Sequence, residues 1–342
     1  MIPEQDSKSP PPPSPITVVY STDDRYAWLA GISIESLLQC HRDVETLEIV
    51  VLDNAVSSVN RQKLLATAAR YGRPLRFIDV TESLARLQSL KISEYSSVSA
   101  YARVLVADLL SGNDGRILYL DCDTLVCAGL HDLLGLSLEG RPIAMGLDCL
   151  RNEYKRVIGL PEDAPYYNSG VLLIDLERWR RCNCMERLID HMRNIRSNYA
   201  LADQDLLNVV LKDDIVRIPA RFNLLSQMLL HDHAGLKTVY GLRESYWIGA
   251  EELEEAKRAP AIYHFSGNTF IRPWYSNSRH PMAAEYHRRI RESEWGDTRL
   301  APFRAPLPYR IQLLGYRFLP RRLFVWMSAC MQRCFMRFFY HV

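Results

Sequence analysis

The sequence predicts an α/β fold that is doubly wound around a parallel sheet, and two observations lead to this expectation. Short apolar runs of strand length alternate with longer segments in which apolar residues recur at helical spacing. The strand-like runs are apolar almost throughout, which indicates strands covered by helices on both faces of the sheet. With 342 residues, of which 48% are hydrophobic and 24% charged, the chain can bury the core of one large domain or two smaller ones.

The first half of the chain shows this alternation most clearly. "ITVVYS" has the composition of a buried strand, and "YAWLAGISIESLLQC" behind it carries apolar residues at helical spacing. The turn "SGNDG" then separates the last helix of this half from the strand "RILYLDCDTLV". The predicted strands are 16–21, 46–53, 75–80 and 116–126, and the predicted helices are 26–40, 60–72 and 99–110.

The second half continues with a strand at 142–148, a strand and its exit helix in 166–180, a helix at 203–211 and a short strand at 261–267. In doubly wound sheets, ligands bind beyond the carboxyl ends of the strands. "YSTDD" and "YLDCD" are both polar exits from apolar strands. Two such exits predict one crevice.

The exit from the first strand argues against a dinucleotide-binding enzyme. In "VVYSTDDRYAWLAG" acidic residues stand where a dinucleotide-binding turn would have glycines, and no G-x-G-x-x-G follows the strand. Dehydrogenases are therefore disfavoured.

The charge of the chain is balanced overall but uneven along its length. A net charge of +2, from 42 basic and 40 acidic residues, gives no field that would favour nucleic acid as a partner. After Asp297, however, there is no acidic residue and there are eight arginines. This basic end of the chain predicts a partner of opposite charge.

The cysteines and the first residues indicate a cytosolic protein. Eight cysteines are scattered without C-x-x-C spacing, and reduced thiols are the simplest interpretation. The start "MIPEQDSKSPPPPSP" lacks the basic-then-apolar layout of a secretory signal. Its prolines predict that 1–15 is an extended, disordered leader outside the fold.

Two aspartates close the strand "ILYLDCDTLV". Because successive side chains of a strand alternate faces, we expect Asp121 and Asp123 to point the same way, with Cys122 opposed to them. Two carboxylates on one side suit Mg²⁺ or Mn²⁺, which bind through a few carboxylates and substrate phosphates. The structural alternative is that one acid caps the following turn while the other is solvated.

A different chemistry uses the same pattern. Phosphatases of the haloacid-dehalogenase type also end an apolar strand on D-x-D, which would make Asp121 a nucleophile. Against this hypothesis, the motif follows three other strands, and Leu125 stands where that family usually has a small hydroxyl or β-branched residue. A convincing downstream lysine and acidic pair is also missing.

Four stretches together resemble the retaining glycosyltransferase family 8, which includes bacterial lipopolysaccharide galactosyl- and glucosyltransferases and glycogenin. They are "VVYSTDDRY", "SAYARVLVADLL" with "YLDCDTLV", "YYNSGVLLIDLERWR" with "DQDLLN", and "YHFSGNTFIRPW". The resemblance covers about residues 16–280. It implies a GT-A type, Rossmann-like single domain with a mixed, mostly parallel sheet, and its four motifs in this order are specific.

The resemblance implies a Mn²⁺ site, or a Mg²⁺ site, formed by Asp121, Asp123 and His264. A neutral imidazole beside carboxylates is chemically reasonable for Mn²⁺. A lone histidine is more often a hydrogen-bonded core residue, but the matched "H-x-x-G…PW" context favours a metal ligand.

The resemblance also implies a UDP-sugar site. Ser21 and Asp23 match positions that contact uridine, although Asp23 and Asp24 could instead cap the helix that begins near Tyr26. Arg103 matches an arginine that reaches toward the donor, and its alternative is a surface helix charge. The other implied donor-binding residues are Cys122, Asp148, Asn168, Ser169, Gly170, Asp203 and Gln204.

The last motif departs from the family pattern. The family commonly has Gly, two residues and then Lys-Pro-Trp, whereas "GNTFIRPW" has four intervening residues and Arg272 in place of the lysine. Gly267 can still present backbone N–H groups to phosphate. Arg272 is expected to neutralise the β-phosphate as UDP leaves.

The implied reaction transfers a hexose, galactose or glucose, from a UDP-hexose to an acceptor hydroxyl with retention at the anomeric carbon. Asp203, Gln204 and Arg272 are the predicted catalytic residues. The matched sugar-pocket motifs contain no obvious carboxylate nucleophile, and an amide such as Gln204 is a poor one. We therefore favour attack from the leaving group's own face, with a β-phosphate oxygen taking the acceptor proton. A saccharide or glycolipid of the lipopolysaccharide type is the expected acceptor.

The C-terminal segment "YRFLPRRLFVWMSACMQRCFMRFFYHV" mixes arginine with aromatic residues and methionine. Its longest uncharged run is about half of the roughly 20 residues that span a bilayer. A basic amphipathic helix on an anionic membrane is predicted, and a helix docked on the domain is the alternative.

The predicted domains are therefore the leader at 1–15, a glycosyltransferase domain at 16–285 and a membrane-association segment at 286–342. The enzyme is expected in the cytoplasm, peripheral on the inner face of the membrane. A membrane-bound scaffold that has lost catalysis is the third hypothesis.

Overall fold

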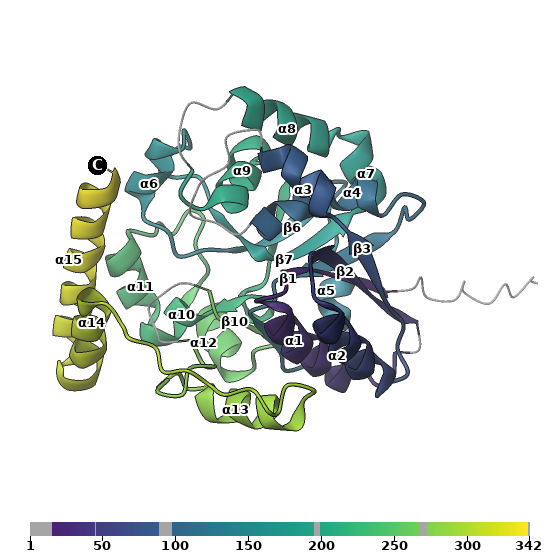
Figure 1. Ribbon diagram of the computed structural model, residues 1–342. Helices are drawn as coiled ribbons and strands as arrows, with labels where there is room; N and C mark the ends of the chain where they lie inside the picture. Colours follow the sequence, from purple (N-terminus) through teal and green to yellow (C-terminus); the bar gives the residue numbers. More distant parts are fainter. Residues whose placement is uncertain (1–15, 45, 89–97, 195–198, 267–271, 341–342) are drawn as a thin grey trace, which may run out of the picture.

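A computed structural model of the chain describes residues 16–44, 46–88, 98–194, 199–266 and 272–340 (Figure 1). The predicted leader and Gly267 lie outside these ranges, so both stay predictions.

The main sheet has seven strands, which are β1 (Ile16–Asp23), β2 (Leu47–Asn54), β3 (Leu75–Asp79), β4 (Arg116–Leu120), β6 (Ile143–Leu147), β7 (Tyr167–Asp175) and β8 (Ile215–Ile218). Across the sheet they lie in the order β3-β2-β1-β4-β7-β6-β8. All neighbouring pairs are parallel except that β7 runs antiparallel to β4 and to β6. The prediction of a mixed, mostly parallel sheet is confirmed.

Helices connect and cover these strands. They are α1 (Ala27–Cys40), α2 (Ser58–Ala69), α3 (Thr81–Gln88), the 3₁₀ helix η1 (Val98–Leu105), α4 (Val106–Leu109), α5 (His131–Leu134), α6 (Asn152–Val157), α7 (Leu176–Arg181), α8 (Cys184–Asn194), α9 (Ala202–Val210), the 3₁₀ helix η2 (Ala220–Phe222), α10 (Ser226–Leu230), α11 (His233–Tyr240), α12 (Ala250–Arg258), α13 (Ala283–Glu292), α14 (Leu307–Phe318) and α15 (Arg321–Tyr340).

Burial on both faces of the sheet explains why the strands are apolar throughout. In β1, Val18 and Tyr20 belong to the core that includes α1 and α2, whereas Val19 belongs to the core that includes α3, α8 and α9. Figure 1 shows these two groups of helices on opposite sides of the strands. The sequence therefore predicted the layers correctly, as expected when both faces of each strand are covered.

The segment predicted as a helix at 99–110 is wound differently. Its first part is the 3₁₀ helix η1, and only α4 is α-helical. Within η1, the Arg103 side chain donates from Nε to the carbonyl of Ala100 at 2.8 Å. A side chain that competes for this carbonyl favours the tighter 3₁₀ winding over a regular α-helix.

The predicted strand at 116–126 is two strands, and this corrects the expectation of one continuous strand through the paired aspartates. β4 ends at Leu120, and β5 (Thr124–Val126) belongs to a second sheet with β10 (Ile262–His264) and β9 (Leu224–Leu225). The aspartates thus lie in a turn between two sheets. The turn forms because Thr124 Oγ1 donates to the Asp121 carbonyl at 2.8 Å.

The C-terminal helices pack on the domain. α15 lies along α11, with α14 beside it (Figure 1). Phe324 of α15 is 1% exposed and stacks on His231, with ring centroids 5.0 Å apart. The predicted division after residue 285 falls within α13, whose Tyr286 and Ile290 are buried. Among the helices of the described ranges, none is long and apolar enough to span a bilayer.

Replacing Phe324 by alanine tests whether the C-terminal hairpin, defined as α14 and α15, is part of the cooperative fold. We expect the Phe324→Ala variant to lose about 3 kcal/mol of unfolding free energy, because a fully buried aromatic ring is removed. Urea unfolding followed by circular dichroism measures this loss. Phe318→Ala is the control, since Phe318 is 67% exposed and its loss should change stability by less than about 0.5 kcal/mol. Equal stability of both variants would show that the hairpin is not part of the core.

Candidate functional site

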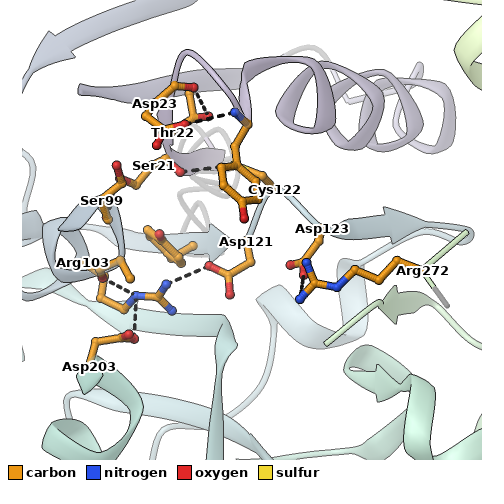
Figure 2. A pocket seen from close by; sticks show the side chains of 13 residues that line it. Ser21, Thr22, Asp23, Ser99, Arg103, Asp121, Cys122, Asp123, Asp203 and Arg272 are labelled. Atoms are coloured by element: carbon orange, nitrogen blue, oxygen red, sulfur yellow. Dashed lines mark hydrogen bonds and ion pairs between the residues drawn. The ribbon is translucent and has the colours of Figure 1, made fainter. Parts of the chain in front are cut away.

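The candidate site lies where β1 and β4, two adjacent parallel strands, end. Parallel strands end at the same edge of a sheet, so the polar residues that follow them meet there. They line a cavity of about 280 Å³ together with side chains from η1, α9 and the segment after β10 (Figure 2). The predicted site residues in its lining are Ser21, Asp23, Arg103, Asp121, Cys122, Asp123, Asp203 and Arg272.

Three side chains converge as a candidate metal centre. Asp121, Asp123 and His264 each offer one ligand atom, and these atoms lie within 4.8 Å of one another. His264 Nε2 is 3.2 Å from Asp123 Oδ1 and 3.8 Å from Asp121 Oδ2. The second sheet brings them together, because the pairing of β10 with β5 places His264 opposite Thr124. Two carboxylates and an imidazole nitrogen are a suitable donor set for a divalent cation.

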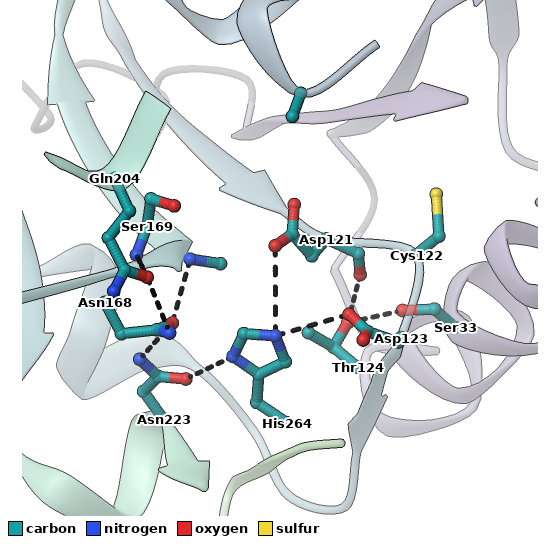
Figure 3. Close-up of polar contacts among 12 residues, drawn as sticks. Ser33, Asp121, Cys122, Asp123, Thr124, Asn168, Ser169, Gln204, Asn223 and His264 are labelled. Atoms are coloured by element: carbon teal, nitrogen blue, oxygen red, sulfur yellow. Dashed lines mark hydrogen bonds and ion pairs between the residues drawn. The ribbon is translucent and has the colours of Figure 1, made fainter. Parts of the chain in front are cut away.

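A chain of amide hydrogen bonds determines which ring nitrogen of His264 faces the aspartates (Figure 3). The backbone N–H of Gly170 donates to Asn168 Oδ1 at 2.9 Å, and Asn223 Nδ2 donates to the same oxygen at 3.1 Å. Asn223 Oδ1 therefore accepts from His264 Nδ1, 3.0 Å away. With its proton on Nδ1, the neutral imidazole presents the lone pair of Nε2 to the two aspartates, as a metal ligand must.

The electrostatic surroundings of His264 are negative. Burial by itself would lower the pKa of His264, but the Asp123 and Asp121 carboxylates outweigh burial and raise it. Burial would likewise raise the pKa of Asp123, but His264 and Arg272 lower it below its usual range. The two carboxylates that favour a positive charge on His264 also favour a metal ion beside it, so the residues present fit a divalent cation.

Arg103 is buried beside the candidate metal centre, and it is not a charge on a helix surface. Its Nη2 donates to Asp121 Oδ1 at 2.8 Å, and its Nε lies 3.1 Å from Asp203 Oδ2. It also donates to the Ser169 carbonyl, and the guanidinium lies 4.6 Å from the centre of the Tyr119 ring. Arg103 therefore fixes the orientation of Asp121 and compensates the charge of this half-buried carboxylate and of the buried Asp203 carboxylate.

A second polar cluster lies next to the candidate metal centre (Figure 3). Asp148 Oδ2 accepts from Asn168 Nδ2 at 3.1 Å and from Gln204 Nε2 at 2.9 Å, and its Oδ1 accepts from Gln227 Nε2 at 3.1 Å. Gln204 Oε1 accepts from Asn168 Nδ2 at 3.0 Å and from the Ser169 N–H at 3.2 Å. Such a connected network presents polar groups at fixed positions, which is what recognition of sugar hydroxyls requires.

Asp203 and Gln204 are neighbours at the start of α9 but serve different clusters. Asp203 lines the cavity with Arg103 and accepts from Ser169 Oγ at 2.9 Å. Its burial raises its pKa, although the Arg103 charge opposes this effect. Gln204 belongs instead to the second polar cluster, which is formed by Asp148, Asn168, Gln204 and Gln227 and is called the amide cluster below. The carboxylates of Asp203 and Asp148 are thus both engaged by protein donors, so neither is a free nucleophile.

One wall of the cavity is formed by Ser21 and Asp23 at the end of β1, and Cys122, from the turn after β4, lies beside them. Ser21 Oγ donates to the Ser99 carbonyl at 2.8 Å, and the Cys122 thiol donates to the Ser21 carbonyl at 3.2 Å. Burial raises the pKa of Cys122, which makes it an unreactive thiol. Asp23 Oδ1 accepts from the N–H of Tyr26 at 3.1 Å in the turn before α1, and Asp24 Oδ1 accepts from the N–H of Ser57, so neither acid forms a side-chain cap of α1 itself. Contacts from Ser21 and Asp23 to uridine stay predictions.

Arg272 reaches the site in spite of the two extra residues in its motif. Its Nη2 lies 3.9 Å from Asp123 Oδ2, and the guanidinium lies 5.3 Å from the centre of the Trp274 ring. Gly267, which begins the motif, is outside the described residues.

Asn223 and Gln227 belong to the site but were not predicted from the sequence. Both occur in "RFNLLSQMLL", where they alternate with apolar residues and where Arg221 and Ser226 are also polar. A polar residue in an apolar run is usually buried and hydrogen-bonded, so the composition carried a signal that something is bound there. It did not indicate that Asn223 orients His264 or that Gln227 contacts Asp148.

Comparison with known proteins identifies the class. Residues 17–278 match the model of the family described as Glycosyl transferase family 8. General stress protein A of Bacillus subtilis is 28% identical over 281 residues, which are 81% of this chain and 94% of that protein. A lipopolysaccharide 1,2-glucosyltransferase of Escherichia coli K12 is 25% identical over 289 residues, covering 82% of this chain and 79% of the relative.

Solved structures agree on the fold. A crystal structure of the galactosyltransferase LgtC, in complex with donor and acceptor sugar analogues, superposes with a TM-score of 0.66 at 24% identity, covering 86% of this chain and 99% of that one. The chain belongs to glycosyl transferase family 8, and its enzyme class is that of a hexosyltransferase. The predicted family and GT-A type fold are confirmed.

Gly170 gives a test of the metal centre, because a Cβ atom at this position would lie 2.1 Å from His264 Cε1. We expect Gly170→Ala to displace the imidazole, to lower the unfolding free energy by about 1–3 kcal/mol, and to weaken stabilisation by Mn²⁺ about tenfold or more. Urea unfolding with and without Mn²⁺ measures both effects.

Gly129→Ala is the matched control, since a Cβ there meets nothing closer than 3.4 Å. A Gly170→Ala protein that is folded and responds to Mn²⁺ as the wild type does would show that His264 is not a ligand.

Proposed function

We propose that the enzyme is a Mn²⁺-dependent, retaining transferase that moves a hexose from a UDP-hexose to a hydroxyl of a lipopolysaccharide-type saccharide or glycolipid. The observation that carries this proposal is the convergence of Asp121, Asp123 and His264 beside the cavity at the ends of β1 and β4. A diphosphate needs such a cation to compensate its charge, and the exit of β1 next to it offers space for a nucleoside.

The residues present suit Mn²⁺ better than Mg²⁺. Mg²⁺ prefers oxygen ligands, and the nitrogen of His264 in the set favours a softer cation. When bound, the cation supplies Lewis-acid stabilisation of the diphosphate leaving group. Arg272, 3.9 Å from Asp123, is placed to add a second positive charge to the same group.

The arrangement of the carboxylates supports attack from the leaving group's own face. Asp203 is engaged by Arg103 and Ser169, and both oxygens of Asp148 accept amide hydrogen bonds. In the proposed step the acceptor hydroxyl forms a bond to the anomeric carbon while the bond from that carbon to the β-phosphate oxygen breaks. The acceptor proton passes to a β-phosphate oxygen, so no enzyme carboxylate needs to be a nucleophile.

The relatives support the acceptor class. Those named for lipopolysaccharide glucosyl and galactosyl transfer cover about four fifths of this chain. We infer a lipid-linked saccharide acceptor and a cytoplasmic enzyme, peripheral on the inner face of the membrane. The outward faces of the C-terminal hairpin support this inference, because they combine exposed Trp326 and Phe318 with exposed arginines.

A panel of UDP-sugars tests the proposed function. With Mn²⁺ present, we expect UDP-galactose or UDP-glucose to protect the protein against thermal unfolding and to be slowly hydrolysed to UDP. Asp123→Asn should abolish the metal-dependent protection, because one charged ligand is lost. Asp132→Asn is the control, as Asp132 is 83% exposed and away from the cavity lining.

Asp121→Asn should behave like Asp123→Asn. A phosphatase nucleophile would instead make Asp121 uniquely indispensable, with phosphate released from simple esters and no need for a sugar nucleotide. Failure of every UDP-sugar to bind would contradict the proposed function.

Charge removal on α15 tests membrane association without disturbing the buried face of the helix. Arg322, Arg333 and Arg337 are exposed. We expect their triple replacement by glutamine to reduce co-sedimentation with anionic phosphatidylglycerol vesicles about tenfold or more, because each arginine near such a surface contributes about 1 kcal/mol.

A triple variant of arginines elsewhere on the surface, Arg86, Arg181 and Arg193 to glutamine, keeps the same net charge as the α15 variant and should bind vesicles as the wild type does. Equal binding of both variants would refute the role of the hairpin.

A further inference from the structure

A second cavity, of about 490 Å³, adjoins the amide cluster on the side away from Arg103 and Asp203. One of its walls is formed by Asp148, Gln204 and Gln227, and the opposite wall by the C-terminal hairpin. We call this cavity the hairpin slot. Asp203 lines the first cavity and Gln204, the next residue, lines the slot, so the start of α9 separates the two.

Two polar atoms in the slot lining are buried without a hydrogen-bond partner among the described residues. They are Gln227 Oε1, whose side-chain nitrogen is held by Asp148, and the hydroxyl of Ser266. An unpaired buried polar group destabilises a folded protein, so such groups point to a partner that the described residues do not supply. A sugar hydroxyl can donate to the first atom and either donate to or accept from the second.

The rest of the slot lining is largely apolar. Leu150 and Tyr240 lie on the domain side, and Met331 and Phe335 lie on the hairpin side. A smaller cavity of about 160 Å³ shares Leu150, Tyr240 and Phe335 with the slot and continues to Met336. Phe335 is 45% exposed, so the apolar lining reaches the protein surface at this residue.

We propose that the hairpin slot binds an amphipathic acceptor, with the saccharide against Gln227 and Ser266 and a hydrocarbon group along Met331 and Phe335. That the ligand is the acceptor rests on the proposed function. That the slot suits an amphipathic saccharide rests only on its polar and apolar lining. The polar end of the slot shares Gln204 with the network that borders the donor cavity, and its apolar end opens at the surface of the hairpin. The C-terminal hairpin is thus a wall of a substrate site as well as a surface element.

Binding of monomeric alkyl glycosides tests this proposal directly, with no donor and no metal added. We expect octyl β-D-galactoside or octyl β-D-glucoside, below its micelle concentration, to bind at least tenfold more tightly than the methyl glycoside in calorimetry. Burial of two methylene groups alone corresponds to about that factor.

Three single variants locate the ligand. Ser266→Ala removes a hydroxyl that has no partner in the described protein, so it should fold normally and bind both glycosides about threefold to tenfold more weakly. Met331→Gln should remove most of the advantage of the octyl chain. Trp326→Gln makes the same change on the outward face of α15, where Trp326 is 64% exposed, and should bind octyl glycosides as the wild type does.

The outcomes separate this proposal from the proposed function. If UDP-sugars bind but octyl glycosides do not, or if Trp326→Gln weakens octyl binding as much as Met331→Gln, the slot proposal is overturned and the transferase stands. If octyl glycosides bind with the expected variant pattern while no UDP-sugar binds, the slot is supported as an amphiphile site and the transferase fails.

Discussion

The pairing of β10 with β5 is the constraint on which the site depends. β5 begins directly after the turn that holds Asp121 and Asp123, and β10 ends with His264, so two three-residue strands join ligands from distant parts of the chain. The His264 ring then lies so close to β7 that only a glycine fits at position 170. The ring orientation follows from a network that already includes Gly170 and Asn168, so the sheet and the amide cluster position one another.

Preorganisation explains why so many charges are tolerated at this edge of the sheet. Asp121 and Asp203 are held by Arg103, and Asp123 lies beside His264 and the cationic Arg272, so each of these partly or fully buried carboxylates already has an arginine neighbour. Buried charges without such partners would destabilise the fold. The fixed arrangement also means that little reorganisation is needed when a charged diphosphate binds, which is where electrostatic catalysis gains most.

The sequence was informative where a local rule controls the outcome. Apolar runs fixed the positions of β1, β2 and β4 because both faces of these strands are covered, and matched motifs identified Asp121, Asp123 and His264 as a group. Local rules did not reveal that the strand breaks at Leu120, because the change of sheet depends on the bond from Thr124 to the turn and on a distant partner strand. Asn223 and Gln227 were missed for the same reason, since their partners come from β7, β10 and the loop after β6.

The sequence of the C-terminal hairpin allowed two interpretations, a helix on a membrane and a helix docked on the domain. The two are compatible because opposite faces of one helix can make different contacts. Phe324 and Met336 of α15 are buried against the domain, Met331 lines the slot, and Trp326 faces outward with the arginines. Gly315 of α14 allows the two helices to approach, since a Cβ there would lie 2.3 Å from Met327 Cε. A hairpin fixed in this way cannot leave the domain to enter a membrane without opening the slot. The proposed membrane contact through the outward face and the proposed acceptor binding through the inner one are therefore compatible only while α15 stays docked. A lipid-linked acceptor would then meet the slot at Phe335, where its apolar lining reaches the surface.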